Sequence, residues 1–309
     1  MNEFALANSA FVVESRIGGG GGGAVYKAWH KRLRMHVAVK MFVLGQSSAK
    51  EPHRTEVEAL ENVESVYLPQ VHDYITESGR AFIVMDYVEG ESFENLLVRG
   101  QRFSDLQCLA WYAQLATALD TLHKNNVCHR DIKPSNIILT PSGSIRLIDF
   151  GAAIVGGKSP GFAARSPGYA SPEQYEAFEQ LLRLRSRKHL FEAVRFSDGI
   201  DWKRSDIYSL GATMYHIFSG TRPHEKAAEV TALSSYRRHG ATVARVIKRS
   251  MHPDPSVRFK SAAEVMDALN RTRGLRLFTS MNLWRSSSSK DLSYSRRGTS
   301  LQKVGSIVE

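Results

Sequence analysis

Residues 129–136 read HRDIKPSN and residues 147–151 read LIDFG, and each segment lies beside a short apolar run. The two segments place Asp131, Asn136 and Asp149 in predicted loops, where catalytic and binding residues are disproportionately found. One carboxylate and one amide are hard oxygen ligands that suit Mg²⁺, which keeps most of its shell for water and substrate phosphate. A second carboxylate on another loop could take or orient a hydroxyl proton. The pattern therefore indicates proton transfer next to a metal-bound phosphate.

The N-terminal part of the chain has the periodicity of β-strands. FVVESRI (11–17) and AVYKAW (24–29) alternate apolar and polar residues, as the two strands of a hairpin do. Two further apolar runs, MHVAVKMFVL (35–44) and AFIVMDYVEG (81–90), also predict strands. The first of these runs carries Lys40, and a lone lysine in such a strand most often faces solvent.

Helical spacing appears in two places. Glu56, Leu60 and Val63 recur at helical intervals between the third and fourth predicted strands. Residues 106–127 predict a core helix with one apolar face, formed by Leu109, Tyr112, Leu115, Ala116, Leu119 and Leu122.

Six consecutive glycines, residues 18–23, separate the first two predicted strands. Glycine costs roughly 0.5–1 kcal/mol relative to alanine in an ordered element, so such a run needs a reason. A flexible linker would be one reason, but the alternating flanks favour a hairpin. A glycine tip leaves backbone N–H groups able to face an anion such as phosphate. At this point a plain turn and a phosphate cover are both open.

Composition narrows the class of protein. The 309 residues are 42% hydrophobic and 23% charged, which is typical of a soluble globular protein with one large domain or two lobes. No apolar run approaches the ~20 residues of a membrane span, and the N-terminus lacks the basic start of a signal peptide. We therefore expect a cytoplasmic location, or export by a route that the sequence does not reveal. Cys108 and Cys128 have neither CxxC nor Cys/His ligand spacing, so we expect ordinary buried or half-buried thiols.

The net charge of +10 is concentrated near the C-terminus. Residues 271–309 hold eight Lys/Arg and two Asp/Glu, a difference of +6. Residues 275–309 are rich in serine and poor in periodic apolar positions, which predicts a disordered tail. Such a tail is most often simply solvated, although it could also bind acidic partners, RNA or anionic lipid.

The motifs GGGGGGAV, VAVK, HRDIKPSN, DFG and SPE, in this order, resemble the signature set of the protein kinase family. The resemblance runs over about residues 11–272 and is most similar to bacterial Ser/Thr kinases of the eukaryotic-like type. It implies an α+β, bilobal fold with a small antiparallel β-sheet and helix C in the N-lobe and a larger, mainly helical C-lobe. The implied divisions are an N-terminal extension (1–10), the N-lobe (11–86), the C-lobe (87–274) with a basic insertion at about 176–203, and the tail (275–309).

The resemblance implies that the glycine hairpin covers the β and γ phosphates of ATP. It puts Gly18, Gly20 and Gly23 on the motif positions, with Gly19, Gly21 and Gly22 between them. The rest of the nucleotide site would be formed by Ile17, Val25, Ala38, Met85 as gatekeeper, Asp86, Val88 and Ile138. Lys40 would hold the α and β phosphates and pair with Glu56 of helix C, with Glu58 as the fallback.

Catalytic roles follow from the same resemblance. Asp131 would be the catalytic base and Lys133 would steady the γ-phosphate. Asn136 and Asp149 would hold Mg²⁺, with Mn²⁺ as an alternative. Phe150 and Gly151 complete the motif that begins with Asp149.

The resemblance also implies structural and regulatory roles. Glu173 should form a buried ion pair with Arg258. Asp206 should orient the catalytic loop, residues 129–136, by bonding its backbone. Ser166, where relatives carry threonine, should bridge Asp131 and Lys133. Arg130 is expected to pair with a phosphate on the activation segment, the stretch between Gly151 and Ser171. Hydroxyl candidates for that phosphate are Ser159, Ser166 and Tyr169, of which we select Ser159.

These features predict an active Ser/Thr protein kinase with autophosphorylation, including the Ser-rich tail. A pseudokinase or partner-activated scaffold is the alternative, although it would ordinarily have lost Lys40, Asp131 or Asp149. A nucleic-acid-binding module would depend only on the basic tail and insertion, and the sequence has no recognisable readout motif for it. We expect protein substrates and a regulatory partner at the insertion or tail. The sequence specifies neither the substrate nor the oligomeric state.

Overall fold

The computed structural model describes residues 10–20, 23–44, 52–157, 165–186, 199–223 and 240–271. Gly21, Gly22, Ser159 and the C-terminal tail therefore lie outside the described residues.

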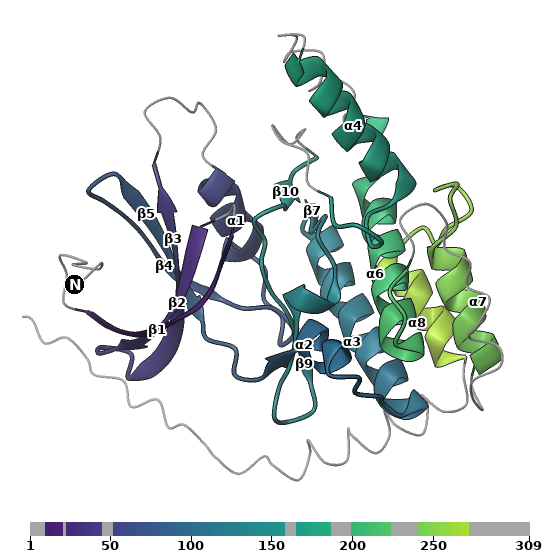
Figure 1. Ribbon diagram of the computed structural model, residues 1–309, viewed down its shortest axis with the longest axis horizontal. Coiled ribbons are helices and arrows are strands. Elements are labelled where there is room, and N and C mark those ends of the chain that lie inside the picture. Colours follow the sequence, from purple (N-terminus) through teal and green to yellow (C-terminus); the bar gives the residue numbers. More distant parts are fainter. Residues whose placement is uncertain are drawn as a thin grey trace, which may run out of the picture.

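An antiparallel five-stranded sheet forms the first lobe (Figure 1). Its strands lie in the order β1-β2-β3-β5-β4. Their bounds are β1 Phe11–Gly20, β2 Gly23–His30, β3 Met35–Val43, β4 Val71–Glu77 and β5 Arg80–Asp86. The predicted hairpin is confirmed, because β1 and β2 pair up to Gly20 opposite Gly23.

One helix, α1 (Pro52–Glu61), accompanies this sheet and contacts β4 and β5. The predicted helical spacing is correct for Glu56 and Leu60, which are both buried. The prediction extended the helix too far at Val63, which is buried but lies after Glu61, the last residue of the helix. A buried position after a helix can satisfy the same apolar pattern, so spacing alone did not define the end.

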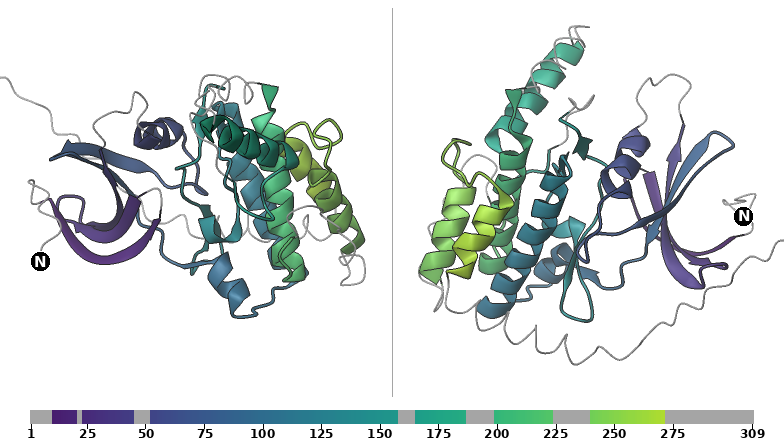
Figure 2. Two further views of the ribbon diagram at one scale, coloured as in Figure 1. Left: turned by 45° about the horizontal axis from the view of Figure 1, so that its top comes forward. Right: turned by 180° about the vertical axis from the view of Figure 1, so that it is seen from behind.

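The second lobe is mainly helical, with helices side by side in Figures 1 and 2. The longer helices are α3 (Asp105–Lys124), α4 (Pro172–Ser186) and α6 (Trp202–Ser219). The shorter ones are α2 (Phe93–Val98), α7 (Gly240–Ser250) and α8 (Ala262–Asn270). All six residues of the predicted apolar face of α3 are buried. Ser104 and Gln107 form a capping box that fixes where this helix begins.

Short strands carry the loops that contain the polar motifs. The pair β7 (Val127–Cys128) and β10 (Ile154–Val155) is antiparallel, as is the sheet of β6 (Glu91–Ser92), β8 (Ile137–Leu139) and β9 (Ile145–Leu147). A 3₁₀ turn, η1 (Pro134–Asn136), lies between β7 and β8. The α+β bilobal architecture is thus confirmed, and the motif loops lie at the edge of the second lobe that faces the first (Figure 2).

The helix α4 accounts for part of the expected insertion. It begins at Pro172 and continues to Ser186, so the described residues from 176 onward continue the helix that carries Glu173. In Figure 1 its far end projects beyond the rest of the lobe. Leu182, near that end, is 51% exposed.

Candidate active site

A cleft of about 940 Å³ lies between the two lobes. Most of the predicted nucleotide-site residues line it: Ile17, Gly18, Gly19, Gly23, Val25, Ala38, Lys40, Met85, Asp86, Val88 and Ile138. Gly21 and Gly22, between the two strands of the hairpin, lie outside the described part of the chain. Gly18, Gly19 and Gly23 are the described glycines through which the hairpin lines the cleft.

Gly90 is a lining residue that the sequence reasoning missed. Its φ of +140° and its position leave no room for a side chain, because a Cβ there would contact the carbonyl oxygen of Leu139. The signal available in the sequence was only a single glycine after an apolar strand. Other lining residues that were not predicted include Pro69, Tyr87, Ser135 and Ala152.

Lys40 does not face solvent, contrary to the usual behaviour of a lone strand lysine. Its side chain is buried, and Nζ lies 2.8 Å from both carboxylate oxygens of Glu56 and 2.7 Å from Oδ1 of Asp149. Burial alone would lower the pKa of Lys40, but the charges of Glu56 and Asp149 outweigh it and raise that pKa. Glu58, the fallback, is exposed, so Glu56 is the partner.

Asp149 follows β9 in a left-handed conformation, with φ +64°. Its Oδ1 accepts hydrogen bonds from Lys40 and from the backbone N–H of Gly151. Burial would raise the pKa of Asp149, but the charge and hydrogen bond of Lys40 lower it overall. The following residue, Phe150, is buried and its ring meets that of His129 at 4.7 Å between centroids.

Asp131 receives three hydrogen bonds. The Ser166 hydroxyl donates to Oδ1 at 2.5 Å, while Lys133 Nζ and Asn136 Nδ2 donate to Oδ2 at 2.8 and 3.0 Å. Lys133 also donates to the Ser166 hydroxyl at 3.0 Å, so the predicted bridge between Asp131 and Lys133 is present. A carboxylate offers about four acceptor sites, and these contacts leave roughly one of them, on Oδ1, for another donor.

Asn136 and Asp149 both line the cleft and fit a divalent cation. The amide nitrogen of Asn136 is used by Asp131, so its carbonyl oxygen is the atom that can act as a ligand. Asp149 uses Oδ1 for its two hydrogen bonds and offers Oδ2. One carboxylate and one amide oxygen are the donors that Mg²⁺ takes alongside water and phosphate.

Asp206 of α6 holds the backbone of the loop that carries Asp131, as predicted. Its two carboxylate oxygens accept hydrogen bonds from the backbone N–H groups of His129 (2.8 Å) and Arg130 (2.7 Å). The same carboxylate is 3.0 Å from Nε2 of His123. Asp206 is fully buried, so the loop is fixed from the core of the second lobe.

Cys128 approaches His123 and Asp206 closely enough to form a group of three potential metal ligands within 4.8 Å. The sequence spacing gave no sign of this group, because α3, β7 and α6 bring it together. Burial raises the pKa of the Cys128 thiol far above its usual range, so the thiolate that a metal needs is disfavoured. Both cysteines are buried, as expected.

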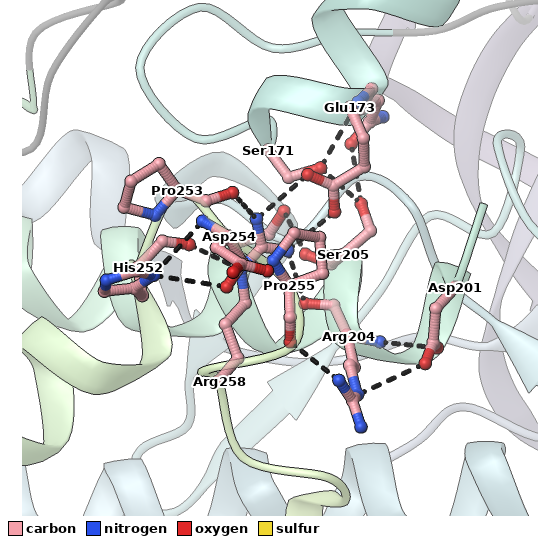
Figure 3. A network of polar contacts seen from close by, with 12 residues as sticks. Ser171, Glu173, Asp201, Arg204, Ser205, His252, Pro253, Asp254, Pro255 and Arg258 are labelled. Atoms are coloured by element: carbon pink, nitrogen blue, oxygen red, sulfur yellow. Dashed lines mark hydrogen bonds and ion pairs between the residues drawn. The ribbon is translucent and has the colours of Figure 1, made fainter.

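Glu173 and Arg258 form the predicted ion pair (Figure 3). Two guanidinium nitrogens of Arg258 donate to the two oxygens of Glu173, at 2.6 and 2.9 Å. The remaining donors reach backbone oxygens of Arg204, His252 and Pro253. The pair thus joins the start of α4 to the start of α6 and to the segment before α8.

Arg130 is the residue expected to pair with a phosphate on the activation segment, and that pairing stays a prediction. Its side chain is buried, and the guanidinium carbon is 4.4 Å from the ring centre of Trp202. Nη1 donates to the backbone oxygen of Ala152 at 3.2 Å. Burial lowers the pKa of Arg130 to about 10, against the opposing charge of Asp206. Ser159, the selected phosphate position, lies outside the described residues.

Comparison with known proteins agrees with this geometry. The family model described as "Protein kinase domain" matches residues 11–287. The chain is 29% identical over 274 residues to the serine/threonine-protein kinase PknA of Mycobacterium tuberculosis, which covers 82% of this chain and 59% of that protein. It is 26% identical over 287 residues to a probable serine/threonine-protein kinase of Clostridium acetobutylicum, covering 87% of this chain and 40% of that protein.

These relatives are longer proteins than this chain. The chain spans less than two thirds of the curated relatives it matches, including 55% of the serine/threonine-protein kinase PknA of Corynebacterium glutamicum. Among the described helices, none combines the length and the apolar character needed for a membrane span.

Proposed function

The chain belongs to the protein kinase domain family, and we propose that it is an active serine/threonine kinase that transfers the γ-phosphoryl group of ATP to protein hydroxyls. The observation that carries the proposal is that one cleft is lined both by Lys40, Glu56 and Asp149, which contact one another, and by Asp131. Lys133 and Ser166 bind the Asp131 carboxylate. The similarity to kinases named serine/threonine-specific supports the acceptor class.

The nucleotide is bound by residues of both lobes in this proposal. Val25, Ala38 and Ile138 form apolar walls for the adenine, and the strand end at Asp86 and Val88 offers backbone groups to its edge. Lys40 binds the α and β phosphates while Glu56 keeps its ammonium group in place. The glycine hairpin covers the β and γ phosphates.

Asp131 accepts the proton of the substrate hydroxyl. Three donors already fix its carboxylate, and the remaining acceptor site on Oδ1 orients the incoming Ser or Thr hydroxyl toward the γ-phosphate. Lys133 stands beside this carboxylate and steadies the transferred group. A general base of this kind typically contributes about 10²–10⁴ in rate.

Asn136 and Asp149 would hold a divalent cation, for which we propose Mg²⁺ with Mn²⁺ as a substitute, and it would neutralise charge on the transferring phosphoryl group. We further propose a bacterial source and a cytoplasmic location, supported by the similarity to bacterial kinases. The proposed lobe boundary is at residues 86–87, and autophosphorylation of the Ser-rich tail is part of the proposal. The pseudokinase alternative is favoured by no observation on the described residues.

The test compares the full chain with Asp149→Asn and with Asp120→Asn, a matched change in an ion pair with Lys124 near the C-terminal end of α3. Each protein is incubated with Mg²⁺ and labelled ATP, and phosphate is located by mass spectrometry. Phosphoserine or phosphothreonine in the wild type and Asp120→Asn, but not in Asp149→Asn, is the expected result. ATP binding without transfer in all three proteins would contradict an active kinase.

A further inference from the structure

Trp202 is buried and is the first residue of α6. Asp201 caps this helix by accepting the backbone N–H of Arg204 at 3.1 Å, which sets where the helix begins. The Trp202 ring packs in a small apolar cluster with Cys128 and Ile154. These two residues lie opposite each other in the β7–β10 strand pair. The tryptophan therefore lies directly beneath the catalytic loop.

The face of this ring is covered by the Arg130 guanidinium. The 4.4 Å between the guanidinium carbon and the ring centre is close enough for a cation–π contact, which is strongest where water is excluded. Arg130 and Trp202 are 2% and 6% exposed, so water is largely excluded here.

Arg130 connects three parts of the site through its other groups. Its backbone N–H is held by Asp206, and its carbonyl oxygen accepts a hydrogen bond from Gln174 Nε2 at 2.8 Å. Its Nη1 reaches the Ala152 carbonyl, three residues beyond Asp149. The Arg130 side chain therefore joins the catalytic loop to the segment after Asp149, while its backbone joins the same loop to α6 and α4.

In kinases controlled by activation-segment phosphorylation, a phosphate is the counter-charge that fixes an arginine at this point. We propose that Trp202 is a positioning residue that fixes the Arg130 side chain in place of such a phosphate. The catalytic loop is then assembled without phosphorylation of the activation segment. The inference rests on the proposed kinase function. It concerns Trp202, which lies four residues before Asp206 and outside the motifs by which the family resemblance was identified.

The contacts of the site are consistent with such an arrangement. The guanidinium of Arg130 is already enclosed between the Trp202 ring and the Ala152 carbonyl. A phosphate that paired with Nη1 would have to compete with the Ala152 carbonyl for that nitrogen.

The first test measures whether phosphorylation is required. The full chain is treated with a protein phosphatase, its unphosphorylated state is checked by intact mass, and the initial rate of transfer from labelled ATP to casein is measured. We expect the treated wild type and Ser159→Ala to reach the rate of the autophosphorylated protein within about twofold, without a lag. Activation of about tenfold or more by phosphorylation, or a lag that shortens with enzyme concentration, would overturn the inference and leave the kinase function intact.

The second test separates positioning from simple packing. Trp202→Phe keeps an aromatic face, whereas Trp202→Leu keeps apolar volume without one. We expect Trp202→Phe to stay within about threefold of wild-type kcat and Trp202→Leu to lose about tenfold or more, with KM for ATP nearly unchanged. A Trp202→Leu protein that keeps wild-type kcat and only melts at a lower temperature would assign Trp202 to packing alone and overturn the inference.

Phe259→Leu is the matched control. It removes a ring 4.3 Å from the Arg249 guanidinium, in a contact of the same kind that does not involve the catalytic loop. It should lower stability and leave kcat and the phosphorylation dependence unchanged.

A third readout does not depend on activity. Phenylglyoxal modifies accessible arginines, and the rate at Arg130 in the unphosphorylated chain can be compared by mass spectrometry with that at Arg99, whose side chain is 61% exposed. We expect Arg130 to be protected in wild type and Trp202→Phe and to react in Trp202→Leu. Reaction of Arg130 at the Arg99 rate in unphosphorylated wild type would overturn the inference, whereas protection of Arg130 with no transfer under any condition would count against the kinase function alone.

Discussion

Lys40 Nζ lies 2.7 Å from Oδ1 of Asp149, although the two residues are 109 positions apart in the sequence. β3 of the first lobe supplies the lysine, and the segment after β9 in the second lobe supplies the aspartate. Glu56 of α1 meets the same ammonium group at 2.8 Å. The cleft thus has its lysine in place only when the two lobes and α1 meet.

Lys40→Met should abolish most phosphoryl transfer. The change removes the cation that binds the nucleotide phosphates and leaves the buried Glu56 without its partner, so we expect a loss of about 10²-fold or more in rate. Transfer of labelled phosphate and ATP affinity by calorimetry are the measurements. Lys27→Met, which removes a half-buried lysine from the neighbouring strand β2, is the control and should stay near wild type. Equal rates for the two variants would rule out the role given to Lys40.

Ser166 should tolerate threonine but not alanine. Its hydroxyl donates to Asp131 and accepts from Lys133, and threonine can supply the same hydroxyl. We expect Ser166→Thr to keep activity and Ser166→Ala to lose about tenfold or more in kcat, because the carboxylate and the ammonium group are then less well oriented. The control is Ser142→Ala, which removes a hydroxyl from the turn between β8 and β9. Full activity in Ser166→Ala would show that the bridge does not position Asp131.

Glu173→Ala should destabilise the second lobe strongly. The Arg258 side chain that it pairs with has no exposed surface, and removing one partner of a buried ion pair typically costs about 3–5 kcal/mol. The free energy of unfolding in urea is the measurement. Glu179→Ala, on the same helix, removes the exposed pair with Arg183 and should cost only about 0–0.5 kcal/mol. A cost for Glu173→Ala as small as that control would mean that the pair contributes little to folding.

His216 should make the protein less stable in acid. Burial, with the charges of Arg222 and Arg102, lowers the pKa of His216 from its usual value of 6.5 to about 4. Between these values the unfolded chain binds a proton that the folded protein does not, so this group removes stability as the pH falls from 6.5 to 4.

Urea unfolding across this pH range measures the effect. His216→Asn should show a shallower loss of stability than wild type, because it removes the titrating ring. Tyr169→Phe is the control, since it deletes the hydroxyl 2.7 Å from Nδ1 but keeps the histidine, and it should follow the wild-type slope. Parallel curves for wild type and His216→Asn would exclude His216 as the source of the acid sensitivity.

Local patterns in the sequence were sufficient to predict helices and strands and the catalytic residues that line the cleft. The alternating residues on either side of the glycines predicted the β1–β2 hairpin, and the apolar face of α3 was correct at every position. Motif order predicted that Lys40, Asp131, Asn136 and Asp149 would share one site, and all four line the cleft. Each of these signals is carried by residues close together in the chain, which is why it can be read without a structure.

The sequence by itself determined the α+β class, the family and the chemical groups of the site. The tertiary structure decided which distant groups meet: Glu56 rather than Glu58 at Lys40, the Cys128–His123–Asp206 group, and the Trp202 ring over Arg130. Helical spacing favoured Glu56 over Glu58 but could not bring it to Lys40 on another element, and no local pattern links a tryptophan to an arginine 72 positions earlier. Those contacts arise only when α1, β7 and α6 pack, because burial then selects which charges and rings are brought within reach of one another.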